Sequence, residues 1–277
     1  MYRGFNLIWN DDKEQQRLKL ESYISEHGSP YSEENITNES ENIKQIQKRY
    51  ISKVNASKIL LDGDKMEEDC FPTVDANIFL SHSHEDEPIA LRIKFLLEKI
   101  YRQKVFVDSC VWKYCNDLLR EIDDEYCRDN DEIYNYHKRN NSTAVVHMML
   151  STALTRMMDK TECMFFLNTK NSNLGAAYGN DVQTASPWLY HELSMTRVLR
   201  KHIDRKAESI QKRSFATAES VSVVHHVDMS HFPVLDMNSF FDWLSKTNGY
   251  SHPNDVLDEL YRIYPQYKRK YLDDDRN

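Results

Sequence analysis

Glycine is scarce in this sequence: the 277 residues include six glycines and seven prolines. Neither a GxGxxG nor a GxxxxGK[ST] loop is present, which excludes the glycine turn of dinucleotide-binding folds and the phosphate loop of P-loop proteins. The five cysteines are odd in number and form no CxxC pair. Neither a disulfide framework nor a structural zinc site is therefore indicated, and we expect reduced thiols, several of them buried.

Long hydrophobic runs are also missing. No apolar stretch approaches the roughly 20 residues that cross a bilayer, and residues 1–14 lack the features of a secretory signal. The net charge is −8, and the best basic runs, 197–213 and 268–270, lie on predicted helices beside acidic residues. A polyanion would need a local basic patch to overcome that field. We expect a soluble cytoplasmic protein with neither a membrane nor a nucleic acid as partner.

Residues 1–70 are polar, and their pattern predicts a helical N-terminal extension with two helices. The first is capped by Asn10 and ends at Gly28, and the second ends near Gly63. The second helix is predicted from apolar residues at helical spacing: Ile43, Ile46, Tyr50 and Val54. One narrow apolar stripe cannot form a core, so the extension is expected to pack on the rest of the protein or on another copy, holding an inactive or ordered assembly; a disordered tether is the alternative.

From residue 76 the sequence alternates short apolar strands with amphipathic helices. The expected strands are residues 77–81, 104–108, 163–168 and 220–227, and the expected helices are residues 88–103, 116–127, 143–160, 186–202, 240–244 and 256–264. A polar insertion covers residues 128–141. This alternation predicts an α/β fold with a parallel sheet that is covered on both faces. Ligands of such sheets bind at the carboxyl ends of the strands, where His82, Asp108 and Asn168 would share one rim.

The segment NIFLSHSHEDEP, residues 77–88, raises the question of a metal site. His82, His84 and Asp86 have the HxHxD spacing of metal-dependent hydrolases of the metallo-β-lactamase type. That pattern continues with a third histidine where this chain has Glu87, and it needs further ligands downstream, where the remaining histidines do not cluster. We therefore expect no metal. In the alternative interpretation His82 is a partly buried strand-end residue, and His84 is solvated.

Three segments occur in a fixed order: NIFLSHSHED, KVFVDSCVW and SPWLYHEL. Together they resemble the Toll/interleukin-1 receptor (TIR) domain over residues 74–247, with residues 1–70 as the extension and residues 248–277 as a C-terminal helical tail. The first segment resembles the opening strand and its FISY-type box, and the second resembles the strand whose acidic residue, Asp108, opens the BB loop. The third resembles the WxxxE element of enzymatic TIR domains, here Trp188 and Glu192.

Within the family the closest resemblance is to bacterial antiphage TIR proteins of the Thoeris type, and WxxxE also occurs in the animal axon-degeneration NAD hydrolase. The resemblance implies a flavodoxin-like fold with short C-terminal helices. It further implies cleavage of NAD+ at the nicotinamide–ribose bond, with NAD+ as substrate and no cofactor, to give an ADP-ribose-type signal. Homo-oligomers formed through TIR contacts and a separate effector protein that senses the product are the implied partners.

One carboxylate is chemically sufficient for that reaction. Cleavage passes through a ribose oxocarbenium ion, as in glycoside hydrolysis, but nicotinamide leaves as a neutral base, so no general acid is required for its departure. We predict Glu192 as the catalytic residue that holds the ribose hydroxyls and offsets the developing positive charge. Trp188, four residues earlier on the same helix face, would form an apolar wall or stack on a ring; packing in the core is the alternative.

The remaining predicted substrate contacts follow the first two strands. Ser81, His82 and Ser83 are expected by resemblance to line the nucleotide, although the family often has aromatic and basic residues there. Asp108 either contacts the substrate or caps the loop before Trp112, and Trp112 is either an interface residue or a local packing residue. Two rival functions stay open: a TIR scaffold without catalysis, and a nucleoside-processing transferase with a glutamate nucleophile.

Overall fold

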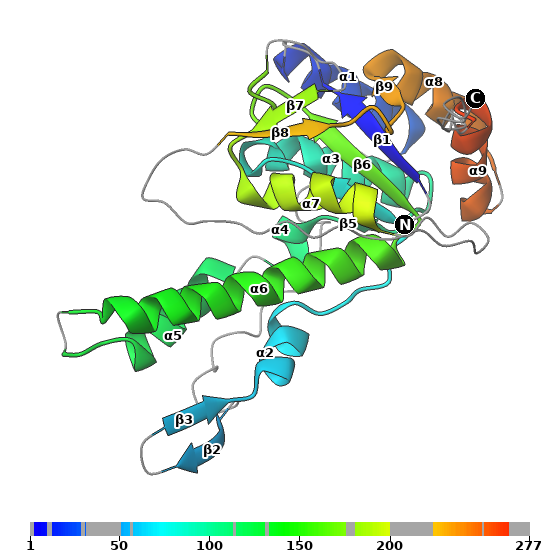
Figure 1. Ribbon diagram of the computed structural model, residues 1–277. Coiled ribbons are helices and arrows are strands. Elements are labelled where there is room, and N and C mark those ends of the chain that lie inside the picture. Colours follow the sequence, from blue (N-terminus) through cyan, green and yellow to red (C-terminus); the bar gives the residue numbers. More distant parts are fainter. Residues whose placement is uncertain are drawn as a thin grey trace, which may run out of the picture.

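The structure is a computed structural model (Figure 1). It describes residues 3–9, 13–28, 31, 51–55, 58–112, 115–130, 133–175, 181–199, 224–250 and 252–265.

A five-stranded parallel sheet forms the centre of the molecule, with strand order β5-β4-β6-β1-β9. Its strands are β5 (Val105–Phe106), β4 (Ile78–Ser81), β6 (Cys163–Asn168), β1 (Arg3–Ile8) and β9 (Val234–Asp236). Together with helices on both faces this arrangement is an α/β fold, consistent with a flavodoxin-like fold, whose strand order is 2-1-3-4-5. The fourth position is filled here by the N-terminal strand of the chain.

Strand β1 contains the mostly apolar run GFNLI, which has no polar face that could lie against solvent. Every residue from Gly4 to Ile8 is buried. It pairs with β6 along its whole length, from Arg3 beside Cys163 to Ile8 beside Asn168, and with β9 on its other side. Near the carboxyl end of the pairing the Asn168 side-chain amide donates to Oδ1 of Asn6 at 3.0 Å. The two polar side chains thereby satisfy each other inside the sheet.

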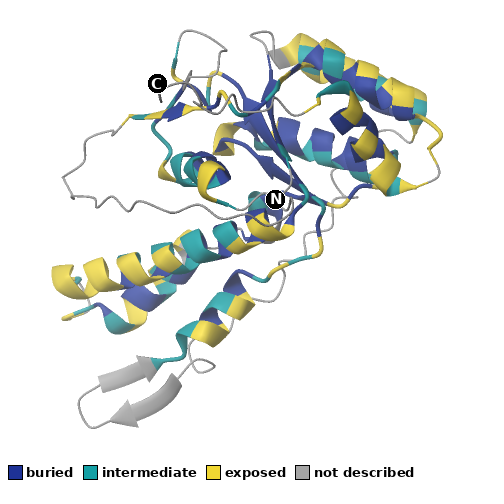
Figure 2. Ribbon diagram, turned by 45° about the vertical axis from the view of Figure 1, so that its right-hand side comes forward, coloured by how far each residue is buried: buried dark blue, intermediate teal, exposed yellow. Residues whose placement is uncertain are grey.

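The two faces of the sheet carry separate apolar clusters because successive side chains of a strand point to opposite faces. Phe5, Ile78 and Phe165 pack with four helices on one face: α1 (Lys13–His27), α3 (Glu87–Lys99), α8 (Met237–Thr247) and α9 (Pro253–Ile263). Phe79 and Phe166 pack on the other face with α2 (Gly63–Cys70), α5 (Cys115–Tyr126), α6 (Tyr136–Lys160) and α7 (Pro187–Val198). In Figure 2 the sheet is dark blue between its two helical layers.

Helix α6 has 25 residues, and in Figure 1 it projects beyond the sheet with α5 packed along its projecting half. Helix α2 contacts α6, and the antiparallel hairpin formed by β2 (Ile51–Asn55) and β3 (Lys58–Leu61) lies beyond α2. A second antiparallel pair, β7 (Asp181–Thr184) and β8 (His225–Asp228), stands apart from the central sheet. None of the described helices is both long enough and apolar enough to cross a membrane.

Most predicted elements from residue 76 onward are confirmed, including the strands at 77–81 and 163–168 and the helices on both sides of them. Two expectations there are wrong. The last predicted strand forms β8, which pairs with β7 rather than entering the central sheet, where β9 takes the edge position. Helix α6 begins at Tyr136, so the end of the expected insertion at 128–141 is helical.

The N-terminal expectation is only partly confirmed. Helix α1 agrees with the predicted first helix, and it is fixed to α3 by an ion pair of 2.7 Å between Glu21 and Arg92. A purely helical extension over residues 1–70 is wrong, because residues 3–8 are a strand of the central sheet and residues 51–61 contain a hairpin. The predicted second helix otherwise falls outside the described residues. Deletion of residues 1–70 would therefore remove a strand of the sheet and not merely a peripheral arm.

Gly4 is the position where the packing of β1 is tightest. A Cβ atom built on Gly4 would lie 2.0 Å from the ring of Phe232. We predict that Gly4→Ala lowers the free energy of unfolding by about 1–3 kcal/mol, because the buried ring has to shift. The measurement is urea unfolding followed by circular dichroism. Gly63→Ala is the matched control, since its Cβ would meet Met149 at an ordinary 3.4 Å; equal stability of the two variants would contradict the prediction.

Candidate active site

The candidate site lies at the carboxyl edge of the sheet, where β4 and β5 end and α7 passes. Ser81 is the last residue of β4, and Asp108 follows β5 and begins the short helix α4 (Asp108–Val111). Glu192 comes from α7, whose N-terminus is capped by Ser186, with Pro187 in the first turn. The three residues are far apart in the sequence, and the parallel sheet brings them to one edge.

Helix α7 turns Glu192 toward the core. Its buried positions are Leu189, Glu192, Leu193 and Thr196, which are spaced i, i+3, i+4 and i+7 and therefore share one helix face. The helix is held against α6 by His191, whose Nε2 lies 3.1 Å from the carbonyl oxygen of Ser151. The carboxyl group of Glu192 thus occupies a position that the helix pattern would normally give to an apolar side chain.

The side chain of Ser81 is the described hydrogen-bond partner of Glu192. Its hydroxyl donates to Oε2 of Glu192 over 2.5 Å, and both residues are buried, with Glu192 only 3% exposed. Burial and, to a smaller extent, the negative charge of Asp108 raise the pKa of the Glu192 carboxyl to about 8, against the opposing effect of the hydrogen bond from Ser81. A carboxyl with a pKa displaced this far by desolvation and a neighbouring charge is a typical active-site feature.

His82 and Asp108 form the second half of the site. Nδ1 of His82 lies 3.7 Å from Oδ1 of Asp108, which is within ion-pair range but too long for a hydrogen bond. The two side chains differ in exposure: that of His82 is 2% exposed and that of Asp108 is 42% exposed. Asp108 is therefore the member of the cluster that faces solvent, and a ligand would approach from its side.

A polar network beside the site was not predicted from the sequence. Asp86, weighed above only as a metal ligand, is fully buried. It accepts hydrogen bonds from the hydroxyl of Ser83 at 2.6 Å, from the hydroxyl of Thr169 and from the side-chain amide of Asn171 at 2.7 Å. The network joins the loop after β4 to the loop after β6. The polar run NTKNSN directly after a buried strand is the sequence signal that points to it.

Ser83 therefore has a structural partner in Asp86, and it is buried like Ser81 and His82. The structure brings Ser81, His82, Asp108 and Glu192 together, and His82 and Asp108 are two of the three residues of the rim predicted from the strand ends. Asn168, also predicted for this rim, instead bonds to Asn6 in the neighbouring strand.

The two tryptophans have packing contacts. Trp112 is 5% exposed; its ring packs edge-on against Phe106 and Phe71, and its indole N–H donates to the carbonyl oxygen of Pro72 at 3.2 Å. These contacts correspond to the alternative in which Trp112 is a local packing residue. Trp188 is half-buried, and its ring meets the imidazole of His147 in α6 at a centroid distance of 5.1 Å. Substrate contacts of these two rings stay predictions.

The two histidines of the HxHxD segment have different surroundings. His82 is buried beside Asp108, whereas His84 is exposed in the short 3₁₀ helix η2 (His84–Asp86). Within the described part of the chain, no three histidine, cysteine, aspartate or glutamate side chains gather in a way that could hold a metal ion.

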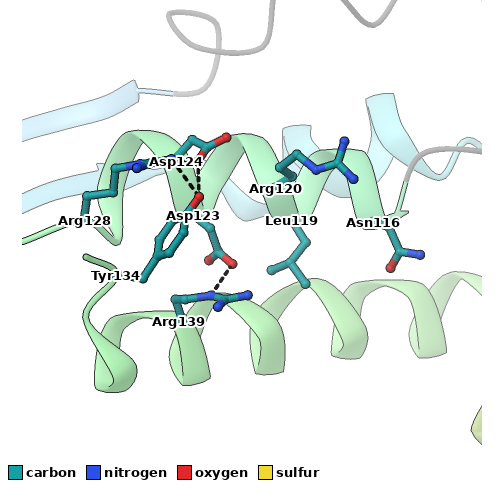
Figure 3. Close-up of a pocket in the computed structure, with 8 residues that line it drawn as sticks. All are labelled: Asn116, Leu119, Arg120, Asp123, Asp124, Arg128, Tyr134 and Arg139. Carbon is teal, nitrogen blue, oxygen red and sulfur yellow. Dashed lines mark hydrogen bonds and ion pairs between the residues drawn. The ribbon is translucent and has the colours of Figure 1, made fainter. Parts of the chain in front are cut away.

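A concavity of about 360 Å³ lies between α5 and α6 (Figure 3). It is lined by Asn116, Leu119, Arg120, Asp123, Asp124, Arg128, Tyr134 and Arg139. The guanidinium groups of Arg128 and Arg139 lie 4.4 and 4.9 Å from the ring centre of Tyr134. The residues of the predicted insertion thus tie the ends of the two helices together, which gives this segment a structural role.

Comparisons with protein-family models, with curated proteins and with solved structures find no match to this chain. The resemblance to TIR domains therefore rests on the three short segments and on the placement of their residues at one sheet edge.

The raised pKa of Glu192 predicts a pH-dependent stability. Between the ordinary pKa of about 4.5 and about 8 the unfolded chain loses this proton while the folded protein retains it, so stability falls as pH rises through that window. Glu192→Gln has no such proton, and the wild type should lose on the order of 3 kcal/mol more than this variant between pH 5 and 8. Urea unfolding at several pH values measures this difference. Glu125→Gln, an exposed site, should follow the wild type, and parallel curves for all three proteins would contradict the assignment.

The carboxylate of Asp123 is the main buried charge between α5 and α6. It accepts from Nε of Arg139 at 2.9 Å and from the hydroxyl of Ser142, and it is almost inaccessible. We predict that Asp123→Ala lowers the free energy of unfolding by about 3 kcal/mol, because the buried hydroxyl and the guanidinium lose their acceptor. Asp129→Ala, at a half-exposed pair with Lys138, should change it by less than about 1 kcal/mol. Thermal denaturation compares the two; similar losses would refute the prediction.

Proposed function

We propose that this protein is a TIR-type NAD+ glycohydrolase or cyclase that breaks the nicotinamide–ribose bond and makes an ADP-ribose-type signal in antiphage defence. The observation that carries the proposal is the buried carboxyl of Glu192, which is hydrogen-bonded to Ser81 at the carboxyl edge of the parallel sheet. Its position agrees with the general rule for ligand sites of such sheets.

The chemistry of the cluster supports this reaction. NAD+ carries a cationic pyridinium, and bond cleavage moves that positive charge onto the ribose ring. An ionised Glu192 stabilises the ring cation most strongly as the charge develops beside it, which is the differential stabilisation that accelerates a reaction. The low exposure of the site strengthens the interaction, because little water is present to screen it.

The ribose hydroxyls have a natural place in this arrangement. The Ser81 hydroxyl donates to Oε2 of Glu192 in the unliganded protein. A ribose hydroxyl that donates to the same carboxylate would replace or join Ser81, so that the sugar is held by the group that stabilises its cation. Asp108, which is partly exposed, adds a second negative charge on the solvent side and favours the approach of a cationic ring.

In this proposal the protein acts in the cytoplasm as a homo-oligomer formed through TIR contacts, and a separate effector senses the product. The rival function is a scaffold that mediates assembly without catalysis. One observation favours the rival: the Ser81–Glu192 hydrogen bond already satisfies a buried carboxyl and ties β4 to α7, as a purely structural contact would.

Catalysis by Glu192 predicts a loss of NAD+ cleavage in Glu192→Gln. Purified protein is incubated with NAD+, and the products are separated by chromatography. The variant should release nicotinamide at least about 100-fold more slowly, because a neutral amide cannot offset the ring cation. In the wild type kcat/KM should rise with pH toward about 8, as the Glu192 carboxyl of the free enzyme ionises.

Glu125→Gln is the control, since Glu125 is an exposed carboxyl on α5. Nicotinamide release that survives in Glu192→Gln would remove the site assignment. If the wild type releases no nicotinamide in any oligomeric state or in extracts of phage-infected cells, the scaffold is the better interpretation.

A further inference from the structure

The imidazole of His82 is buried without a complete set of partners. Its side chain is 2% exposed, and among the residues that the structure describes its Nδ1 has no hydrogen-bond partner. Buried polar nitrogens are rarely left in this state, because desolvation without a hydrogen bond is costly. The unpartnered Nδ1 therefore indicates that a further group forms a hydrogen bond with His82 when the protein functions.

Asp108 indicates what that group is. Its Oδ1 lies 3.7 Å from Nδ1 of His82. At this separation one oxygen atom can lie at an ordinary hydrogen-bond distance of about 2.8 Å from both atoms, once it enters from the exposed side of Asp108. It would donate one proton to the carboxylate and one to the imidazole. A water molecule has the two donors that this position requires.

Two carboxyl groups share this edge of the sheet with His82. Asp108 faces the imidazole from the segment after β5, and Glu192 comes from α7 and is hydrogen-bonded to Ser81, the residue before His82. A carboxylate beside an imidazole orients the ring and offsets the charge that the ring gains when it accepts a proton in a reaction. Histidine is also the side chain that most often transfers protons in enzymes.

We propose that His82, held by Asp108, is the general base that activates the water molecule which captures the ribose cation. This inference rests on the proposed function and assigns a second catalytic residue to the same site. It also identifies water as the molecule that captures the ribose cation, because a base that activates water makes hydrolysis to linear ADP-ribose the main outcome.

The step balances without a further reactant. The C–N bond to nicotinamide breaks, and its electron pair leaves with the neutral pyridine. The water oxygen then forms a bond to C1′ of the ribose, while one of its O–H bonds breaks and the proton passes to Nδ1 of His82. The imidazolium, stabilised by Asp108, returns the proton to solvent before the next turnover.

The test separates the two halves of the reaction. Exchange of isotopically labelled nicotinamide into NAD+ reverses the first step and requires no proton transfer, whereas hydrolysis requires a base. His82→Asn should slow hydrolysis about 100-fold and leave exchange within about threefold, so that the ratio of exchange to hydrolysis rises about 100-fold. Asp108→Asn should raise the same ratio by at least about tenfold, and it serves as the second variant if His82→Asn does not fold by circular dichroism.

The matched control is His84→Asn, because His84 is an exposed histidine two residues away; its ratio should equal that of the wild type. An unchanged ratio in folded His82→Asn, or a loss of exchange together with hydrolysis, would overturn the role of His82 and leave the proposed function standing. If the wild type neither cleaves NAD+ nor exchanges nicotinamide, the proposed function fails, and this inference fails with it.

Discussion

The parallel pairing of β1 with β6 and β9 is the interaction on which the rest of the structure depends. It places the first strand of the chain between segments that lie more than 150 and more than 220 residues later, and it joins the β5-β4-β6 half of the sheet to β9. Helices α1, α8 and α9 cover one face of the sheet. The apolar surface on which they pack is complete only when β1 is in place. The Asn6–Asn168 bond and the close fit of Gly4 against Phe232 fix the register of this pairing.

The electrostatics of the site at the sheet edge follow from the burial of Glu192. Glu192 lies on the core-facing stripe of α7, so that desolvation, more than any one neighbour, raises its pKa. The nearby charge of Asp108 adds to the effect, and Ser81 alone among the described contacts opposes it. A carboxyl group on the buried face of a helix retains its proton to higher pH than one in water, because desolvation disfavours the charged form. The Asp86 network is different, since three donors surround one carboxylate and make a rigid support for the loops after β4 and β6.

Sequence reasoning predicted the part of the fold in which local pattern and tertiary position agree. The strands at 77–81 and 163–168 are apolar runs followed by polar residues, and the rule on carboxyl ends was sufficient to place His82 and Asp108 on one rim, whereas Asn168 of the same prediction bonds to Asn6. It missed β1, because a six-residue run containing Arg3 and Asn6 has no periodicity that marks a strand, and only pairing on both sides buries it. Asp86 and the strand at 225–228 likewise contact partners that lie far along the chain. Local propensity and residue spacing do not reveal such partners, so these roles could not be predicted.

The place of β1 in the sheet also has a consequence for biosynthesis. The ribosome makes β1 before either of its neighbours, and the second neighbour, β9, emerges more than 220 residues after it. Until then the segment GFNLI has no edge to join on that side and stays exposed, and closure of the sheet requires contacts between distant parts of the polypeptide, which form slowly. The apolar segment of β1 is therefore the part of the nascent sheet that a chaperone would most need to protect, and the sheet is complete only after β9 has been made.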